Sequence, residues 1–166
     1  MRPLTEEETQ AVFKKLAEYT GASLKNIIAP QEDGDRNVFR LSQNRVYLEL
    51  AWVCKFTKSG KFRIHITALP ILAEHARHKL WIRPNGVMPF LYGGNVVKAH
   101  VGRYSEDCPE HQGLVIYTMD DVPLGFGVSA RSTAESRRLD PTGVVCFRQA
   151  DCGEYLRDED TLFQSG

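Results

Sequence analysis

Nine lysines and arginines lie between residues 50 and 105 of this 166-residue chain, where Glu74 is the only acidic residue. They are Lys55, Lys58, Lys61, Arg63, Arg77, Lys79, Arg83, Lys98 and Arg103. Residues 106–166, by contrast, carry five basic and twelve acidic side chains. A cationic segment attracts phosphate backbones, because binding a polyanion releases its condensed counterions. The chain is neutral overall, yet its charge pattern predicts a polyanion site. The alternative is a solvated surface without a ligand.

The first basic residues of this segment have the spacing of a β-hairpin. Residues 61–67 alternate between apolar and polar side chains, which is typical of a strand with one solvated face. A turn at residues 58–60 would bring the cations of both arms close to a passing RNA backbone. The alternative is an edge strand whose lysines prevent aggregation. The hairpin residues predicted to bind RNA are Lys55, Lys58, Lys61 and Arg63.

A second basic group follows, near the expected junction of two domains, where a ligand cleft is common. Its members predicted to bind RNA are Arg83, Lys98, His100 and Arg103. Trp81 lies in an apolar run and is expected in the core. Tyr92 and Tyr104 lie nearer to loops and basic residues, so both base stacking and core packing stay open for them.

We find no catalytic, metal or cofactor site in the sequence. The four cysteines form no CxxC pair, so neither a zinc site nor a disulfide framework is expected. His75 and His78 lack a third metal ligand nearby. Residues 125–130 match the dinucleotide fingerprint GxGxxA, but the apolar helix that must follow it is missing. No apolar run approaches a membrane span in length, so we expect no membrane partner.

The expected elements change in type along the chain. Thr5 and Glu8 have capping-box spacing, and Gly21 follows an apolar stripe, so we predict a helix between them. Shorter helices are expected at 23–28 and 70–77. Strands are expected at 38–41, 46–50 and 61–67. After residue 79, short apolar runs separated by Gly, Pro and Asn predict a compact β-barrel or sandwich.

The order of several short segments resembles one known family. The segments are residues 1–9, 55–58, 61–63, 67–69, 81–84, 90–93, 121–128 and 149–155. Their joint occurrence is similar to the small two-domain factors of 60S ribosomal subunit biogenesis, nucleolar proteins with a C-terminal PUA domain. The resemblance implies an α+β protein: an N-terminal α/β domain with an antiparallel sheet and helices at 1–77, a PUA-type β pseudo-barrel at 78–158, and a flexible tail at 159–166.

The same resemblance implies a function without catalysis or cofactors. A monomer would bind pre-rRNA or other single-stranded RNA, pre-60S particles and nucleolar assembly factors, in the nucleus and nucleolus. Archaeal relatives look as if they hold RNA through basic residues on a PUA strand and its following turn. The matching positions here are uncharged and offer at most an apolar or stacking contact. They are Gly143, Val144, Phe147 and Ala150.

One segment departs from the family pattern. The family has a helix and a strand between the segments that match residues 46–47 and 55–56, whereas here residues 48–54 alone fill the gap.

Two other functions stay open. One is a protein–protein adaptor with little RNA contact. The other is a subunit of an RNA-modifying enzyme, although 77 residues are few for a catalytic domain.

Overall fold

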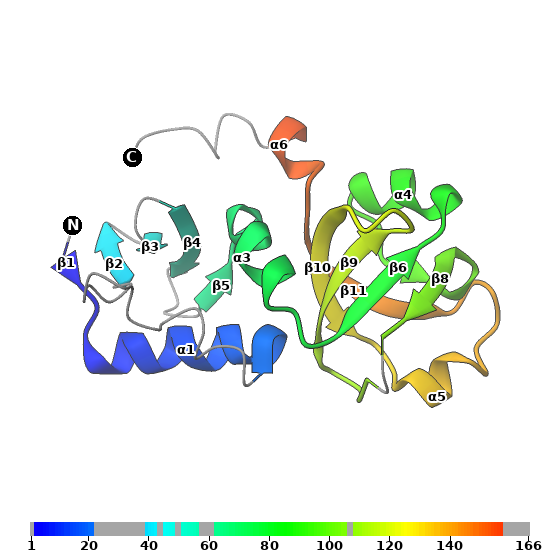
Figure 1. The fold of residues 1–166 in the computed structure, drawn as a ribbon, viewed down its shortest axis with the longest axis horizontal. Coiled ribbons are helices and arrows are strands. Elements are labelled where there is room, and N and C mark those ends of the chain that lie inside the picture. The colour runs from blue at the N-terminus through cyan, green and yellow to red at the C-terminus, as the bar shows by residue number, and fades with distance from the viewer. Residues whose placement is uncertain are drawn as a thin grey trace. The chain divides into compact units, whose positions relative to one another are not determined.

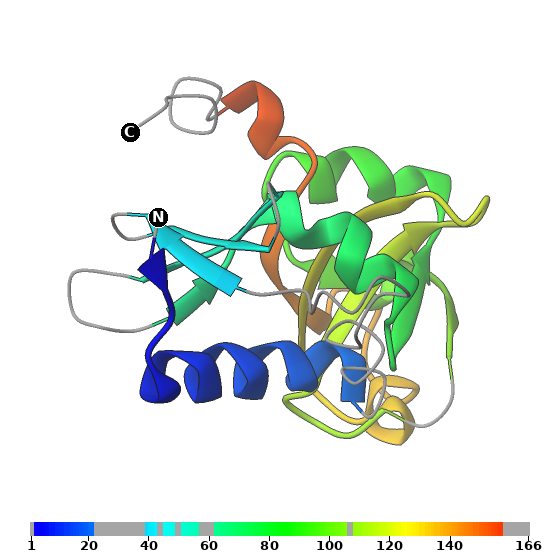
Figure 2. The same cartoon turned by 60° about the vertical axis from the view of Figure 1, so that its left-hand side comes forward.

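The structure, a computed structural model, describes residues 2–21, 39–42, 45–48, 51–56, 62–105 and 108–157. Side chains are described for residues 4–21, 63–105 and 108–156. The chain forms two compact units, Met1–His75 and Ala76–Gly166 (Figures 1 and 2). The predicted division lies between residues 77 and 78. The predicted helix at 23–28, the turn at 58–60 and the tail at 159–166 fall outside the described residues.

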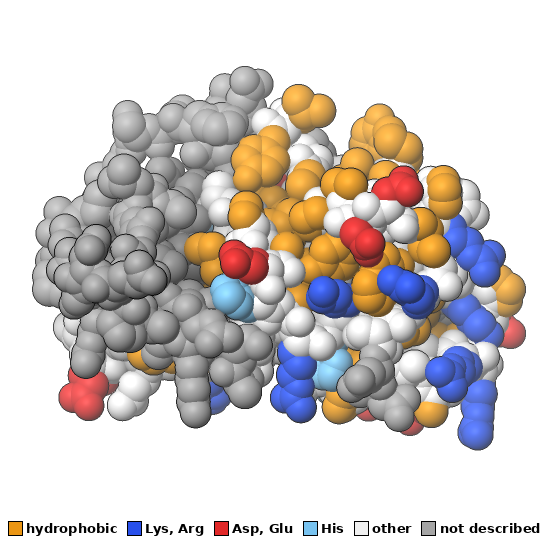
Figure 3. Space-filling view, in the orientation of Figure 1, with side chains coloured by type: hydrophobic (Ala, Val, Ile, Leu, Met, Phe, Trp, Pro, Cys, Tyr) orange, Lys and Arg blue, Asp and Glu red, His pale blue; other side chains and the backbone are white. Residues whose placement is uncertain are grey.

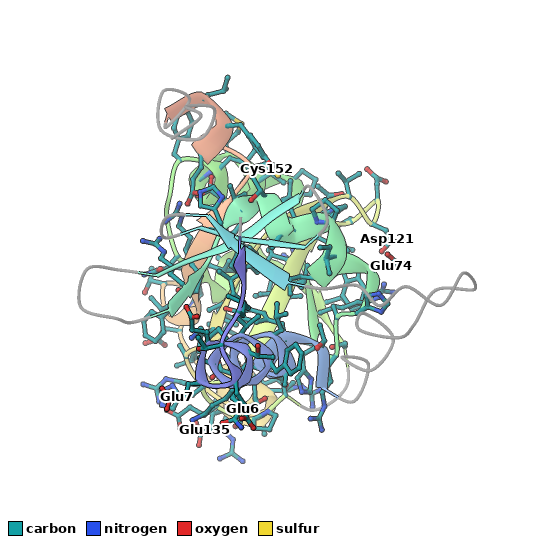
Figure 4. The ribbon with its side chains drawn as sticks, turned by 90° about the vertical axis from the view of Figure 1, so that its left-hand side faces the viewer. Glu6, Glu7, Glu74, Asp121, Glu135 and Cys152 are labelled. Atoms are coloured by element: carbon teal, nitrogen blue, oxygen red, sulfur yellow. The ribbon has the colours of Figure 1, made fainter. Side chains whose placement is uncertain are left out.

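The predicted helix is present in the first unit as α1 (Glu6–Thr20). The capping box is present: the Glu8 amide donates to Thr5 Oγ1 over 3.3 Å, and the Thr5 amide donates to Glu8 Oε1 over 3.1 Å. Gly21 ends the helix with φ 56°, a left-handed value that glycine adopts without strain. Figure 4 shows Glu6 and Glu7 in the first turn, where negatively charged carboxylates interact favourably with the positive end of the helix dipole.

A five-stranded antiparallel sheet completes this unit with α1. Its strands lie in chain order: β1 (Arg2–Pro3), β2 (Phe39–Ser42), β3 (Arg45–Leu48), β4 (Ala51–Phe56) and β5 (Phe62–Ile64). Leu48 of β3 pairs with Ala51 of β4, so these two strands are neighbours in the sheet. Lys55 pairs with Arg63 in the predicted β4–β5 hairpin.

The strand predicted at 61–67 is shorter than expected. β5 ends at Ile64, and a 3₁₀ turn, η2 (Ile66–Ala68), leads into α3 (Leu69–Glu74). Half-buried His65 caps that turn, because its Nδ1 accepts a hydrogen bond from the Thr67 amide. Its ring is therefore engaged with the chain instead of joining Arg63 on a solvated strand face. Such local side-chain bonds to the backbone compete with strand pairing.

The second unit is the predicted β pseudo-barrel. Its strands are β6 (Lys79–Ile82), β7 (Val96–Val97), β8 (Val101–Tyr104), β9 (Gly113–Thr118), β10 (Pro123–Ser129) and β11 (Val144–Asp151). They follow the order β7-β11-β10-β9-β6-β8, in which only the β6–β9 pair is parallel. The core that these strands enclose contains Leu80, Ile82, Phe90, Leu114, Ile116 and Cys146.

Four short helical segments lie on this unit: α4 (Pro84–Leu91), η3 (Lys98–His100), α5 (Thr133–Ser136) and α6 (Glu154–Arg157). The sequence predicted turns and short strands where α4 lies, so that prediction is wrong. Pro84 is compatible with a first helical turn, and Phe90 is buried in the core. Tertiary burial here overrides the low helix propensity of the segment. Among the described helices, none has the length and apolar character to cross a membrane.

Candidate nucleic-acid interface

Two of the four predicted cations of the first unit, Lys55 and Arg63, lie on the β4–β5 hairpin. Lys55 pairs with Arg63 across the two strands, and the Arg63 side chain is exposed. The Lys55 side chain and the whole of Lys58 and Lys61 lie outside the described residues. The hairpin itself brings the two ends of this basic group together, which is the geometry that the RNA prediction requires.

In the second unit, three paired positions form a row across β8, β6 and β9. Arg103 pairs with Trp81, and Trp81 pairs with Tyr117. The Arg103 guanidinium lies 4.0 Å from the centre of the Trp81 ring, a cation–π contact. The Trp81 and Tyr117 rings stack at 5.9 Å between centroids. Trp81 is 9% exposed, which agrees with its predicted packing role.

Two further side chains complete this row. The Lys79 ammonium lies 5.5 Å from the centre of the Tyr117 ring. The Trp81 indole Nε1 donates a hydrogen bond to Asp121 Oδ1 over 2.6 Å. Burial, with a smaller contribution from the Asp121 carboxylate, raises the pKa of Tyr117 to about 12. Hydrophobic side chains gather on this unit in Figure 3, with Lys and Arg side chains around them.

Lys98, by contrast, is engaged by the backbone. Its Nζ donates to the carbonyl oxygens of Arg137 and Leu139 over 2.7 and 2.5 Å, just after α5. An ammonium that satisfies two carbonyls at a helix C-terminus stabilises the fold and has fewer donors left for phosphate. The structure therefore weakens the prediction that Lys98 binds RNA.

His100 is also packed against the fold. A Cβ atom added at Gly86 would lie 2.5 Å from His100 Cβ, so the start of α4 closely contacts this half-buried residue. Arg83, which precedes α4, is exposed. Within the described residues Arg83 forms no ion pair. Of the second predicted group, Arg83 and Arg103 thus keep the exposure that a ligand contact requires.

The four uncharged PUA positions differ in exposure. Phe147 is 44% exposed on β11, whereas Ala150 is 2% exposed and its side chain is absent from the surface. Gly143 and Val144 are half-buried. The contact surface predicted from these positions is therefore centred on Phe147.

The two tyrosines left open between stacking and packing also differ. Tyr92 is exposed and still available for stacking, while Tyr104 is half-buried. Burial raises the pKa of Tyr104 to about 12.

Sequence reasoning missed the role of Arg148. This side chain forms ion pairs with Asp151 and Glu154, and both carboxylates are buried. The pairs join the end of β11 to α6. The i, i+3 spacing of Arg148 and Asp151 was the available signal, but a contact at that spacing on a strand end depends on the turn that follows. Tyr117 gave no separate signal, because its ring contacts Lys79 and Trp81 of another strand, β6.

Within the described residues, no group of three or more His, Cys, Asp or Glu side chains could hold a metal ion. Burial raises the pKa of the Cys108, Cys146 and Cys152 thiols. A raised pKa disfavours the thiolate, which is the opposite of what a cysteine nucleophile needs. Figure 4 shows Cys152 beyond the end of β11.

The arrangement of the second unit is that of a PUA-type domain. A PUA domain from Aeropyrum pernix K1 superposes with a TM-score of 0.66 at 11% identity, covering 93% of this chain and 87% of the other. A hypothetical protein from Pyrococcus horikoshii OT3 gives a TM-score of 0.62 at 13% identity, covering 91% and 95%. These likenesses establish the fold.

Sequence comparisons establish the family. The "NIP7/UPF0113, pre-PUA domain" matches residues 1–50, and the "UPF0113 PUA domain" matches residues 78–160. The 60S ribosome subunit biogenesis protein NIP7 of Saccharomyces cerevisiae is 56% identical, covering 98% of this chain and 99% of the relative. The Xenopus laevis homologue is 48% identical, with coverage of 98% and 99%. The chain therefore belongs to the NIP7 family, as its sequence segments predicted.

The comparison also shows that the chain is shorter than its relatives. The alignment with the Saccharomyces protein has 182 positions and the chain has 166 residues, so at least 16 positions have no counterpart here.

Proposed function

We propose that this protein is a non-catalytic assembly factor of the large ribosomal subunit that binds precursor ribosomal RNA. The observation that carries the proposal is the 56% identity to a 60S ribosome subunit biogenesis protein over almost the whole chain. It acts within pre-60S particles, alongside other assembly factors, and therefore in the nucleus and nucleolus.

Each unit contributes RNA contacts of its own: the β4–β5 hairpin in the first unit and Arg83 in the second. The cations in this proposal are Lys55, Lys58, Lys61, Arg63 and Arg83. Lys98 and His100 contribute less, because the fold already engages them. Contacts of this kind go to phosphates, so they fix the position of the protein on RNA without reading its sequence.

The mechanism makes affinity strongly dependent on salt. About five phosphate contacts on single-stranded RNA give a log–log salt slope near −3.5, since each contact contributes about −0.7. Binding of a labelled single-stranded RNA across a salt series measures this slope. A flat dependence in the parent protein would remove RNA binding from the proposal.

The hairpin is tested by a variant with Lys55, Lys58, Lys61 and Arg63 replaced by Ala. Loss of four phosphate contacts makes the slope shallower by about 2.8. The matched control replaces Lys14, Lys15, Arg137 and Arg138 by Ala, which removes the same charge elsewhere. Both variants are first checked for folding by circular dichroism. Equal losses in the two variants would show an effect of net charge, and an unchanged slope in the hairpin variant would move the RNA to the second unit.

The biogenesis role is tested in budding yeast that lacks its own NIP7 protein. We expect this chain to restore the level of free 60S subunits in sucrose gradients. If a folded and well-expressed chain left 60S levels depressed, the assignment would fail for this protein even if it bound RNA.

An adaptor role has one supporting observation, the 44% exposure of Phe147 on β11. A large apolar side chain at that exposure fits a protein contact as well as a stacked base. A Phe147→Glu variant separates the two. Full RNA binding together with loss from pre-60S particles would favour the adaptor, whereas a loss of RNA binding by the purified variant would assign Phe147 to RNA.

A further inference from the structure

A second surface of the PUA-type unit lies on the outside of β6, β8 and β9, together with the β9–β10 hairpin. We call it the β6–β8–β9 face. Arg103, Met119 and Val122 are exposed on it, Lys79 is half-buried, and Trp81 and Tyr117 lie buried beneath them. We propose that this face docks a segment of a partner protein that presents a carboxylate next to an apolar side chain. The docking is independent of RNA and goes beyond the function proposed above.

The carboxylate would meet Arg103. Within the described residues, neither Arg103 nor Lys79 forms an ion pair. The Arg103 guanidinium stacks 4.0 Å from the centre of the Trp81 ring, and its side chain remains exposed. Stacking on an aromatic face holds the guanidinium in a fixed plane and leaves its N–H donors at the edge. A carboxylate can then bind in bidentate geometry at a smaller entropic cost.

The apolar contact would be made by the β9–β10 hairpin. Met119 and Val122 are 48% and 53% exposed, although both are large hydrophobic residues. The hairpin that carries them is braced, because Thr118 Oγ1 accepts hydrogen bonds from the Asp120 and Val122 amides. It presents two apolar side chains from a fixed backbone, as an interface anchor requires.

The hairpin is also joined to the face itself. Asp121 Oδ1 accepts the hydrogen bond from the Trp81 indole, and Met119 Sδ lies where a Cβ atom at Gly102 would be 2.4 Å away. Met119 therefore packs onto β8 beside Arg103. The cation and the apolar side chains thus belong to one surface, so a single partner segment can contact both.

The charges on this face favour protein over RNA. Asp120 and Asp121 lie on the same hairpin and are exposed, so a phosphate backbone that spans the face would meet both, whereas a single carboxylate needs only the Arg103 guanidinium. Trp81 and Tyr117 are 9% and 6% exposed, which leaves no open ring for a base to stack on. Arg, Met, Trp and Tyr are the residues that protein interfaces concentrate. These observations reassign Arg103 from the predicted RNA contacts to a protein contact.

Site-specific photocrosslinking tests the proposal. A photoreactive phenylalanine analogue replaces Met119, and a control chain carries it at Ala134, an exposed position on α5. In Figure 4, Glu135 of α5 lies well away from Asp121 of the hairpin. Each chain is incubated with a pre-60S fraction from budding yeast and irradiated. Protease and ribonuclease digestion then show whether the adduct is protein or RNA, and mass spectrometry maps the crosslinked peptide.

We expect position 119 to give a protein adduct that maps to one peptide containing Asp or Glu, and position 134 to lack that adduct. In the Met119 photoreactive chain, Arg103→Glu should reduce the adduct about tenfold or more, because a hot-spot ion pair becomes a repulsion. The matched control Arg138→Glu makes the same charge change beyond α5 and should leave the adduct unchanged. An RNA adduct at 119, no adduct there, or an adduct insensitive to Arg103→Glu would overturn the proposal.

A second variant keeps the test valid if Arg103→Glu fails to fold. Val122→Asp changes an exposed side chain and should also reduce the adduct about tenfold. Retained crosslinking in folded Val122→Asp would overturn the apolar part of the proposal. The salt slope of RNA binding should be the same in Val122→Asp and the parent. A variant that loses the protein adduct but keeps the salt slope of RNA binding shows that this docking is separate from the RNA function. If the parent protein itself failed to bind RNA, that result would count against the earlier proposal alone.

Discussion

Arg103 and Arg148 lie in the same unit but in opposite surroundings. Arg103 stacks on Trp81 and forms no ion pair within the described residues. Arg148 forms ion pairs with Asp151 and Glu154, whose carboxylates are buried. The first arrangement leaves hydrogen-bond donors for a ligand, while the second uses them to fix α6 to the end of β11. A basic residue in an RNA-binding fold is thus a candidate ligand contact only after its partners within the fold are known.

The same contrast separates Lys98 from Arg83. Both belong to one predicted RNA-binding group, but Lys98 donates to two backbone carbonyls and Arg83 is exposed. Sequence spacing places both residues near the same turn-rich segment. The satisfied donors of Lys98 show that charge density along the chain overestimates the charge available to a ligand.

The largest expected difference in the free energy of unfolding is between the variants Arg148→Met and Arg103→Met. Removing Arg148 takes away the guanidinium that pairs with two buried carboxylates, and breaking a buried ion pair costs about 3–5 kcal/mol. Removing Arg103 loses an exposed cation–π contact, worth about 0.5–1 kcal/mol. Urea denaturation of the two variants measures the free energies of unfolding. Similar losses would show that the two arginines do not differ in structural role.

Two glycines extend this comparison to packing. A Cβ atom at Gly125 would lie 2.2 Å from the Ala150 carbonyl oxygen, whereas one at Gly102 would lie 2.4 Å from Met119 Sδ. Backbone cannot move aside, so Gly125→Ala should cost about 1–3 kcal/mol or more. The end of an exposed Met side chain can rotate away, so Gly102→Ala should cost less. Thermal unfolding measures both, and a larger loss in Gly102→Ala would contradict the expectation.

Lys98→Met provides a smaller test of a cation that the fold uses. Loss of hydrogen bonds from the ammonium to two carbonyls should cost about 1 kcal/mol, given that the site is half-buried. The salt slope of RNA binding should be unchanged. Arg83→Met should show the reverse pattern, with little loss of stability and a slope shallower by about 0.7. A slope change in Lys98→Met that matches Arg83→Met would return Lys98 to the RNA site.

The smallest effect concerns alkaline pH. Burial raises the pKa of Tyr117 and of Tyr104 to about 12 in the folded protein, above the ordinary value of 10.0. The neutral phenol is therefore favoured by folding, and the stability it contributes is present below pH 10 and lost as the pH rises toward about 12. Tyr117→Phe should lose less stability over this interval than the parent. Denaturation at several pH values, with tyrosine absorbance, checks this.

Much of the fold could be predicted from short-range patterns. The capping box of Thr5 and Glu8 and the glycine at residue 21 set α1, since these signals act within one helical turn. The apolar runs after residue 79 predicted most of the barrel strands. Residues 84–91 were predicted wrongly, because the burial of Phe90 outweighs local Pro and Gly signals. His65 was predicted in a strand but lies outside it, because its ring caps the following turn.

The candidate site, too, was predicted from the sequence only in part. The sequence by itself determined the family, the two-part organisation of α/β and β-rich segments, and the position of the basic residues, because these depend on residue order and local periodicity. Only the tertiary structure decided which cations are available. Arg103 stacks on Trp81 of another strand, and Lys98 bonds to carbonyls that follow α5. Arg148 pairs with the last residue of its own strand and with Glu154 of α6, so all three sets of contacts depend on how the chain folds back. Strand pairing brings distant residues together, and no short-range pattern in the chain specifies that pairing.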